Sequence, residues 1–179
     1  DAKGASLVAA QSELVALSPT QFLMLSRDSN NGYGMKGSTS LYRRIDVLDV
    51  AGATNIAASD FDKAKPVAPK GALDAAVKPA TLTTFIDIND NAQLSRYGLH
   101  NGEPNDGKNL SEKWESMALA SVLDPARPEE FFLFVGNDND FRTTDGFQVG
   151  AAYKDEDGAD VSTTFLVYRV GLPMLAKRP

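Results

Sequence analysis

Apolar residues in this chain come in short runs separated by clusters of Gly, Pro, Asn, Asp and Ser, a pattern typical of β-strands joined by turns. Branched and aromatic side chains are concentrated in these runs, which are too short for long helices. We predict strands over residues 12–17, 21–27, 40–47, 83–88, 116–122, 131–135 and 163–170. The sequence therefore indicates an all-β fold.

Other segments depart from this pattern. Residues 49–82 are rich in Ala, Lys, Asp and Pro, and their prolines interrupt any regular element, so we predict a surface insertion. Residues 89–99 predict a short helix that leads into a polar loop. The Asp-Gly pair within residues 155–158 predicts a hairpin turn between strands 147–153 and 163–168.

The end of the strand at 131–135 is the most informative point in the chain. Gly136 follows it, and then four consecutive carboxamide or carboxylate side chains occupy residues 137–140. Side chains of this kind cap local backbone groups in Asx turns. Acidic groups packed together also repel one another unless a cation or hydrogen-bond donors neutralise them. Both a structural turn and a ligand site remain open at this point.

Short strands with turns between them suggest a sandwich, a barrel or a propeller. A propeller blade takes roughly 40–50 residues, and propellers close with about four to eight blades. Without the insertion, the chain has material for about three to four blades. We therefore expect a partial β-propeller that a missing N-terminal chain or segment completes. A complete small β-sandwich is the alternative if the chain folds alone.

Composition excludes several classes of function. The chain has 18 basic and 24 acidic residues and a net charge of -6, which argues against nucleic acid as a partner. No apolar run approaches about 18 residues, so we expect no membrane span. Cysteine is absent, which excludes disulfides and thiolate chemistry. The first residue is Asp1, and no signal peptide is seen, so we expect a processed product of a longer precursor.

Two single residues complete the survey. His100 is the sole histidine and lies in a polar loop beside Asn101. No nucleophile elbow accompanies it, so we interpret it as a surface residue and not as a member of a catalytic triad. Asn109 begins an Asn-Leu-Ser sequon, which predicts a glycosylation site if the chain enters a secretory route.

Several motifs together resemble the esterase-like phytase family. They are Leu-Met-Leu-Ser-Arg-Asp at 23–28, Trp-Glu-Ser-Met-Ala-Leu at 114–119, Phe-Val-Gly-Asn-Asp-Asn-Asp-Phe at 134–141 and Phe-Leu-Val-Tyr-Arg-Val at 165–170. The resemblance implies that residues 1–179 are the C-terminal part of a single β-propeller domain from a secreted or periplasmic protein. It also implies that the N-terminal remainder of the precursor is a companion chain.

The family's name implies hydrolysis of phosphate or carboxylic esters. The side chains that match its motifs lie at strand ends, which converge on the central channel of a propeller. Oxygen ligands of this kind suit Ca²⁺, which could polarise an ester or activate water. We predict the metal ligands to be Asp28, Glu115, Asp138 and Asp140, of which Glu115 and Asp138 also act as catalytic groups. We predict substrate binding by Arg27, Asn137 and Asn139.

Two alternatives stay open. Arg27 could instead form a structural ion pair with Asp28 or Glu115 that links two blades. The protein could likewise be a non-enzymatic propeller that binds a glycan, a protein or another ligand, with carboxylates that serve structure alone. In either case the ligand is expected to be a small ester, a glycan or a similar molecule.

Overall fold

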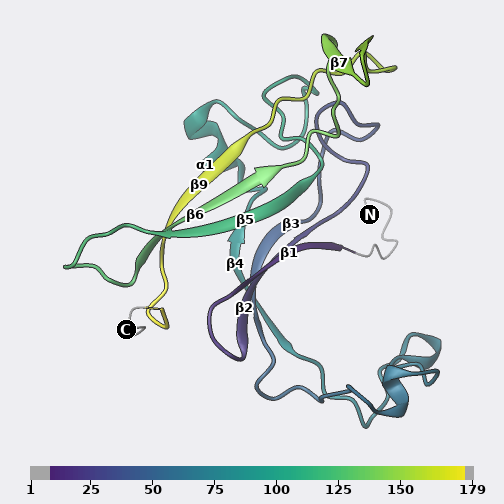
Figure 1. Cartoon of the computed structure of the whole chain (residues 1–179), viewed down its shortest axis with the longest axis vertical. Helices are drawn as coiled ribbons and strands as arrows, with labels where there is room; N and C mark the ends of the chain where they lie inside the picture. Colours follow the sequence, from purple (N-terminus) through teal and green to yellow (C-terminus); the bar gives the residue numbers. More distant parts are fainter. Residues whose placement is uncertain (1–8, 176–179) are drawn as a thin grey trace.

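The structure is a computed structural model that describes residues 9–175. Its first sheet is an antiparallel meander of four strands in the order β1-β2-β3-β4 (Figure 1). These strands are β1 Ala10–Ala16, β2 Gln21–Arg27, β3 Arg43–Asp49 and β4 Thr81–Asp87. Each strand pairs with its neighbour in sequence, so the sheet is built by local hairpins and one long connection.

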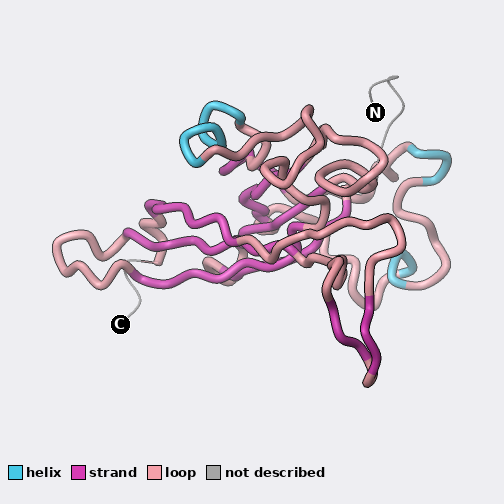
Figure 2. The backbone as a smooth tube through the Cα atoms, turned by 90° about the horizontal axis from the view of Figure 1, so that it is seen from above, coloured by secondary structure: helices cyan, strands magenta, loops and turns pink. Residues whose placement is uncertain are grey.

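The second sheet has three antiparallel strands in the order β5-β6-β9. They are β5 Trp114–Ser121, β6 Glu130–Asn137 and β9 Phe165–Gly171. A separate hairpin of β7 Gly146–Gln148 and β8 Ala151–Tyr153 projects away from both sheets (Figure 2). The described residues are therefore all-β, as predicted.

The two sheets pack against each other through β1, β2 and β5. Alternating apolar residues explain this packing, because every second side chain of a strand points to the same face. Leu23 and Leu25 of β2 belong to one buried cluster with Leu133 and Val135 of β6, and Trp114 lies in the same core. This shared core holds the loop ends of the two sheets side by side.

Helical structure is confined to short turns. The α-helix α1 Asn91–Leu94 continues into the 3₁₀ turn η3 Ser95–Tyr97, so the predicted helix exists but is shorter than 89–99. Asp90 caps it by accepting a hydrogen bond from the Ala92 N–H. The remaining 3₁₀ turns, η1 Asp60–Asp62 and η2 Pro69–Gly71, lie in the exposed connection between β3 and β4. Figure 1 shows this connection extending away from the sheets.

The predicted hairpin of 147–153 with 163–168 is wrong. Asp155 and Gly158 do form a turn, with Gly158 at a φ of +73°. The flanking segments nevertheless pair elsewhere, because β8 returns to β7 and β9 pairs with β6. Turn chemistry indicated the bend correctly but did not determine the partners of the strands.

The predicted number of sheets is also corrected. The described residues contain two sheets of blade size, not three to four. The predicted insertion was already left out of that estimate, but the connections at 88–113 and 138–164 also take up residues that it had counted as blade material. Within residues 9–175, no helix is long and apolar enough to cross a membrane.

Candidate functional site

The nominated residues Arg27, Asp28 and Glu115 lie where β2 ends and β5 begins, and residues 137–140 lie at the end of β6. Arg27, the last residue of β2, forms ion pairs with Glu112 at 3.3 Å and with Glu115. Glu112 also accepts a hydrogen bond of 2.8 Å from the Asn30 N–H. Arg27 and Glu112 are both buried. The predicted alternative, in which Arg27 links the two sheets through Glu115, is therefore what the structure contains.

Asp28 has a different role from the one predicted. Its buried carboxylate accepts hydrogen bonds from the Ser40 hydroxyl at 2.6 Å, the Leu41 N–H at 2.8 Å and the Asn31 amide at 3.1 Å. These donors come from one loop, so Asp28 ties residues 28–42 into a fixed turn. Both carboxylate oxygens are engaged by the protein itself.

Arg43, at the start of β3, is a central residue that sequence reasoning missed. Its side chain is 0% exposed, and its guanidinium donates to the carbonyls of Asn31 and Leu110 and to the side-chain oxygens of Asn89 and Asn101. Burial lowers its pKa to about 10, although neighbouring carboxylates favour the charged form. One cation thus holds together two long connections, 28–42 between β2 and β3 and 88–113 between the two sheets.

The segment after β6 is an Asx-rich turn. The Asp138 carboxylate accepts from the Asp140 N–H at 2.9 Å, and the Asn139 oxygen accepts from the Phe141 N–H at 3.0 Å. Asp140 and Phe141 both have left-handed backbone conformations, with φ of 54° and 55°. Local side-chain capping stabilises a turn of this shape. The Asx turn that the structural alternative predicts is therefore present.

Asn137 is the buried member of the motif. Its amide donates to the Ser111 hydroxyl at 2.8 Å and to the Ser162 carbonyl at 3.1 Å, and its oxygen accepts from the Thr164 N–H. Asn139 extends the same contact by donating to the Val161 carbonyl at 3.1 Å. Both amides therefore fasten the end of β6 to residues 161–164.

The acidic members of the motif face the surface. Asp140 forms an ion pair of 2.6 Å with Lys113, and this hydrogen bond raises the pKa of Lys113. Asp138 is exposed, and its carboxylate accepts a hydrogen bond from the Asp140 N–H. Lys113, together with backbone donors, thus balances the negative charge that the sequence placed here.

The predicted calcium ligands do not fit a metal centre. Within residues 9–175, no group of three His, Asp or Glu side chains is placed to hold a metal ion. Both oxygens of Asp28 accept hydrogen bonds from the protein, Glu115 is paired with Arg27, and Asp140 is paired with Lys113. A Ca²⁺ site needs six to eight oxygen ligands that point to one position. The structure does not bring these four carboxylates together in that way.

The two remaining predictions concern the loop at 100–110. His100 lies in this loop, where its ring nitrogens contact the Gly102 carbonyl and Asp106. Asn109 is only 4% exposed, and its amide nitrogen donates to the Ser38 carbonyl at 2.8 Å. A glycan attached to that nitrogen would require this loop to open, so the prediction of glycosylation at Asn109 conflicts with the fold.

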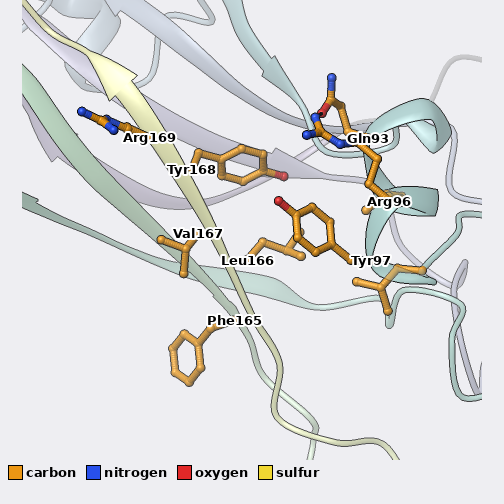
Figure 3. Close-up of a pocket in the computed structure, with 10 residues that line it drawn as sticks. Gln93, Arg96, Tyr97, Phe165, Leu166, Val167, Tyr168 and Arg169 are labelled. Atoms are coloured by element: carbon orange, nitrogen blue, oxygen red, sulfur yellow. Dashed lines mark hydrogen bonds between the residues drawn. The ribbon is translucent and has the colours of Figure 1, made fainter.

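A further cavity lies elsewhere, between β9 and the α1–η3 segment. It measures about 550 Å³, and Figure 3 shows Tyr97 directed toward β9 beside Leu166 and Tyr168. Burial raises the pKa of Tyr168 to about 12. Leu94 and Leu99 also line the cavity with apolar side chains. Its polar lining comes from the side chains of Gln93, Arg96 and Arg169. We call this cavity the β9 cleft.

Sequence reasoning did not identify the β9 cleft. The one available signal was the run at 165–170, in which both alternating sets of side chains carry apolar residues. A strand with two apolar faces is expected to be covered on both sides. That signal indicates burial of the strand, but it does not indicate a cavity along its edge.

Comparisons with known proteins identify one informative relative. A protein of Arthroderma benhamiae, named "Uncharacterized secreted protein", is 38% identical over 155 aligned residues. The similarity covers 82% of this chain and 30% of the relative, so the chain spans under a third of that protein's length. No family model and no solved structure matches the chain. The prediction that the protein is secreted is confirmed, and the resemblance to esterase-like phytases stays a prediction.

Proposed function

We propose that this chain contributes two adjacent blades to a secreted β-propeller and belongs to a binding module, not to an ester hydrolase. The observation that carries the proposal is the engagement of Arg27, Asp28 and Asn137 in contacts that hold the sheets and loops together. A hydrolase of the predicted kind needs such groups free to touch metal, water or substrate. Here these three side chains form their hydrogen bonds and ion pairs with other groups of the protein.

The outer faces of the two sheets support a propeller over a complete sandwich. A two-sheet sandwich normally turns polar side chains outward. In this chain, Phe165 and Val167 of β9 and Phe134 of β6 are exposed on the outer side of the second sheet. Leu14 of β1 and Leu82 of β4 are exposed in the first sheet. Apolar faces on both sides favour further sheets as neighbours.

The remainder of the same protein is the proposed source of those neighbouring sheets. The Arthroderma relative is much longer than the region it shares with this chain. We therefore keep an N-terminal portion of the protein, present as a companion chain or segment, as the partner. The ligand of the completed module is proposed to be a glycan, a protein or another molecule bound without turnover.

The test is an assay of p-nitrophenyl phosphate, p-nitrophenyl acetate and phytate hydrolysis by the native protein, with added Ca²⁺ or with EDTA. We expect no turnover above background and no change of Tm in EDTA. Glu115→Gln is the informative variant, and Glu156→Gln is its control because Glu156 is exposed on the 155–158 turn. Calcium-dependent turnover that is lost in Glu115→Gln but kept in Glu156→Gln would reject the binding-module proposal in favour of the hydrolase.

A further inference from the structure

The second sheet ends in an open edge. β9 is its last strand, and within residues 9–175 no strand pairs with the side of β9 that faces away from β6. The first sheet has four strands and the second has three. An edge of this kind presents unpaired N–H and C=O groups to whatever lies beside it.

The hydrogen bonds of the β6–β9 pair determine which residues face that edge. The Leu172 N–H donates to the Glu129 carbonyl at 2.7 Å, and the Asn137 N–H donates to the Thr164 carbonyl at 3.2 Å. In an antiparallel pair, hydrogen-bonded positions alternate along the strand. The even-numbered residues of β9 therefore bond to β6, whereas Phe165, Val167 and Arg169 direct their backbone groups toward the open edge.

The β9 cleft runs along this same edge. Phe165 to Arg169 form one wall, and the α1–η3 segment forms the other. Figure 3 shows Leu166, Tyr168 and Tyr97 between the two walls, with Val167 and Phe165 on the other side of the strand. The space beside β9 is thus apolar at its base and bordered by a row of backbone donors and acceptors.

The charged residues that line the cleft are Arg96 and Arg169, while the carboxylates of Asp87 and Asp90 act on Tyr168 from beside it. Arg96 donates to the Gln93 side-chain oxygen at 3.0 Å, and among the described residues it has no acidic partner. Arg169 is already paired with Glu130. An occupant that carries a carboxylate opposite Arg96 would form an ion pair with it.

We propose that the β9 cleft receives an extended strand from the part of the protein outside residues 1–179, which adds a fourth strand to the second sheet. This inference rests on the proposed propeller assembly and identifies where one element of the partner binds. The incoming strand pairs its backbone with Phe165, Val167 and Arg169. It places apolar side chains beside Tyr97 and Leu166 and an acidic side chain near Arg96.

A strand fits this cleft better than a compact apolar ligand. An apolar ligand would cover Tyr97 and Leu166 but would leave the backbone groups of Phe165, Val167 and Arg169 without partners away from water. Each such group costs about 1–3 kcal/mol when it is buried unsatisfied. A strand satisfies all of them and buries the same apolar wall.

The experiment is residue-resolved amide hydrogen exchange on two samples, the 179-residue chain and the complete secreted protein. In the chain alone we expect fast exchange at Phe165, Val167 and Arg169 and slow exchange at Leu166 and Tyr168. In the complete protein we expect the first three amides to slow by on the order of 100-fold. Unchanged fast exchange of those three amides in the complete protein would overturn the inference.

A matched pair of variants tests the same point in the complete protein. Val167→Pro removes the edge N–H, which an outward-facing edge position tolerates, and Val167→Ala shortens the side chain but keeps the N–H. We expect Val167→Pro, but not Val167→Ala, to raise exchange at Phe165 and Arg169 at least tenfold. Equal exchange in the two variants would contradict backbone pairing and favour a ligand held by side chains.

Carbene footprinting of Phe134 separates this inference from the propeller proposal. Protection of Phe134 in the complete protein, with fast exchange at Val167, would retain the neighbouring blade and reject the added strand. Exposure of Phe134 together with fast exchange at Val167 would reject both.

Discussion

The ion pairs of Arg27 give the sharpest test of how the two sheets are held together. Arg27→Met preserves much of the apolar stem but leaves Glu112 buried without its cationic partner. Breaking a buried pair in this way costs about 3–5 kcal/mol. For a chain of 179 residues, 1 kcal/mol corresponds to roughly 2–4 °C in Tm, so we expect a fall of roughly 6–20 °C.

Glu115→Gln is the matched control for that prediction. Glu115 is partly exposed, and Arg27 still forms its ion pair with Glu112 when Glu115 loses its charge. We expect a loss of about 1 kcal/mol or less. Adding Glu112→Gln to Arg27→Met should recover part of the stability, because the buried charge disappears. Urea unfolding at pH 7 measures all four proteins. The reasoning is refuted if Arg27→Met costs under about 1 kcal/mol or if Glu115→Gln costs as much.

Three further predictions concern single loops. Gly32→Ala should lower the free energy of unfolding, measured in urea, by at least about 2 kcal/mol. The added Cβ would lie 2.7 Å from a guanidinium nitrogen of Arg43, and the backbone φ of +135° is itself unfavourable for alanine. Gly98→Ala is the control, because open space surrounds Gly98, and it should cost only about 1 kcal/mol. Hydrogen bonding to Arg142 lowers the pKa of Asp155 to about 2, so Asp155→Asn should have a lower Tm than wild type above about pH 5. This difference in Tm should shrink as the pH falls toward 2, because the wild-type carboxylate then becomes protonated. A difference in Tm that does not depend on pH would contradict this prediction. Asn137→Ala should lower the free energy of unfolding by about 2–3 kcal/mol, because it removes buried hydrogen bonds. Asp138→Ala should lower it by under about 1 kcal/mol, because Asp138 is exposed. The opposite ranking in urea unfolding would contradict a structural role for the motif.

The strands could be predicted well because their signal is local. β2 Gln21–Arg27 has the predicted bounds, and β6 Glu130–Asn137 contains the predicted 131–135. Alternation and branched side chains belong to the strand itself. β3 begins at Arg43, later than the predicted residue 40, because Asp28 holds residues 40 and 41 in a loop.

Pairing between distant strands could not be predicted in the same way. β9 pairs with β6 across 27 intervening residues, from 138 to 164, and no local turn specifies that choice. The Asp-Gly turn near residue 158 was a correct local signal that led to an incorrect partner. Strand partners depend on which faces become buried together, and this is a property of the whole sheet.

The candidate site was predicted only in part. The pairing of Arg27 with Glu115 was one of two open alternatives, but Glu112 was not considered because it lies before the matched motif. Arg43, which stands beside Arg44 in the sequence, was not predicted to belong to the site, although it is fully buried. Nothing in an Arg-Arg pair distinguishes a buried cation from an exposed one until the surrounding loops are in place.

The motif at 137–141 shows why a cluster of carboxylates and amides does not by itself indicate a metal. Repulsion between Asp138 and Asp140 is the feature that suggested a cation. In the structure, backbone N–H groups and Lys113 are the positive partners of the two carboxylates. The side-chain amides of Asn137 and Asn139 donate hydrogen bonds to the carbonyls of Ser162 and Val161. A sequence signature that fastens a strand end to a loop needs these side chains as much as a calcium site would. Resemblance at this motif therefore supports a shared turn before it supports a shared reaction, and hydrolysis has to be established by turnover.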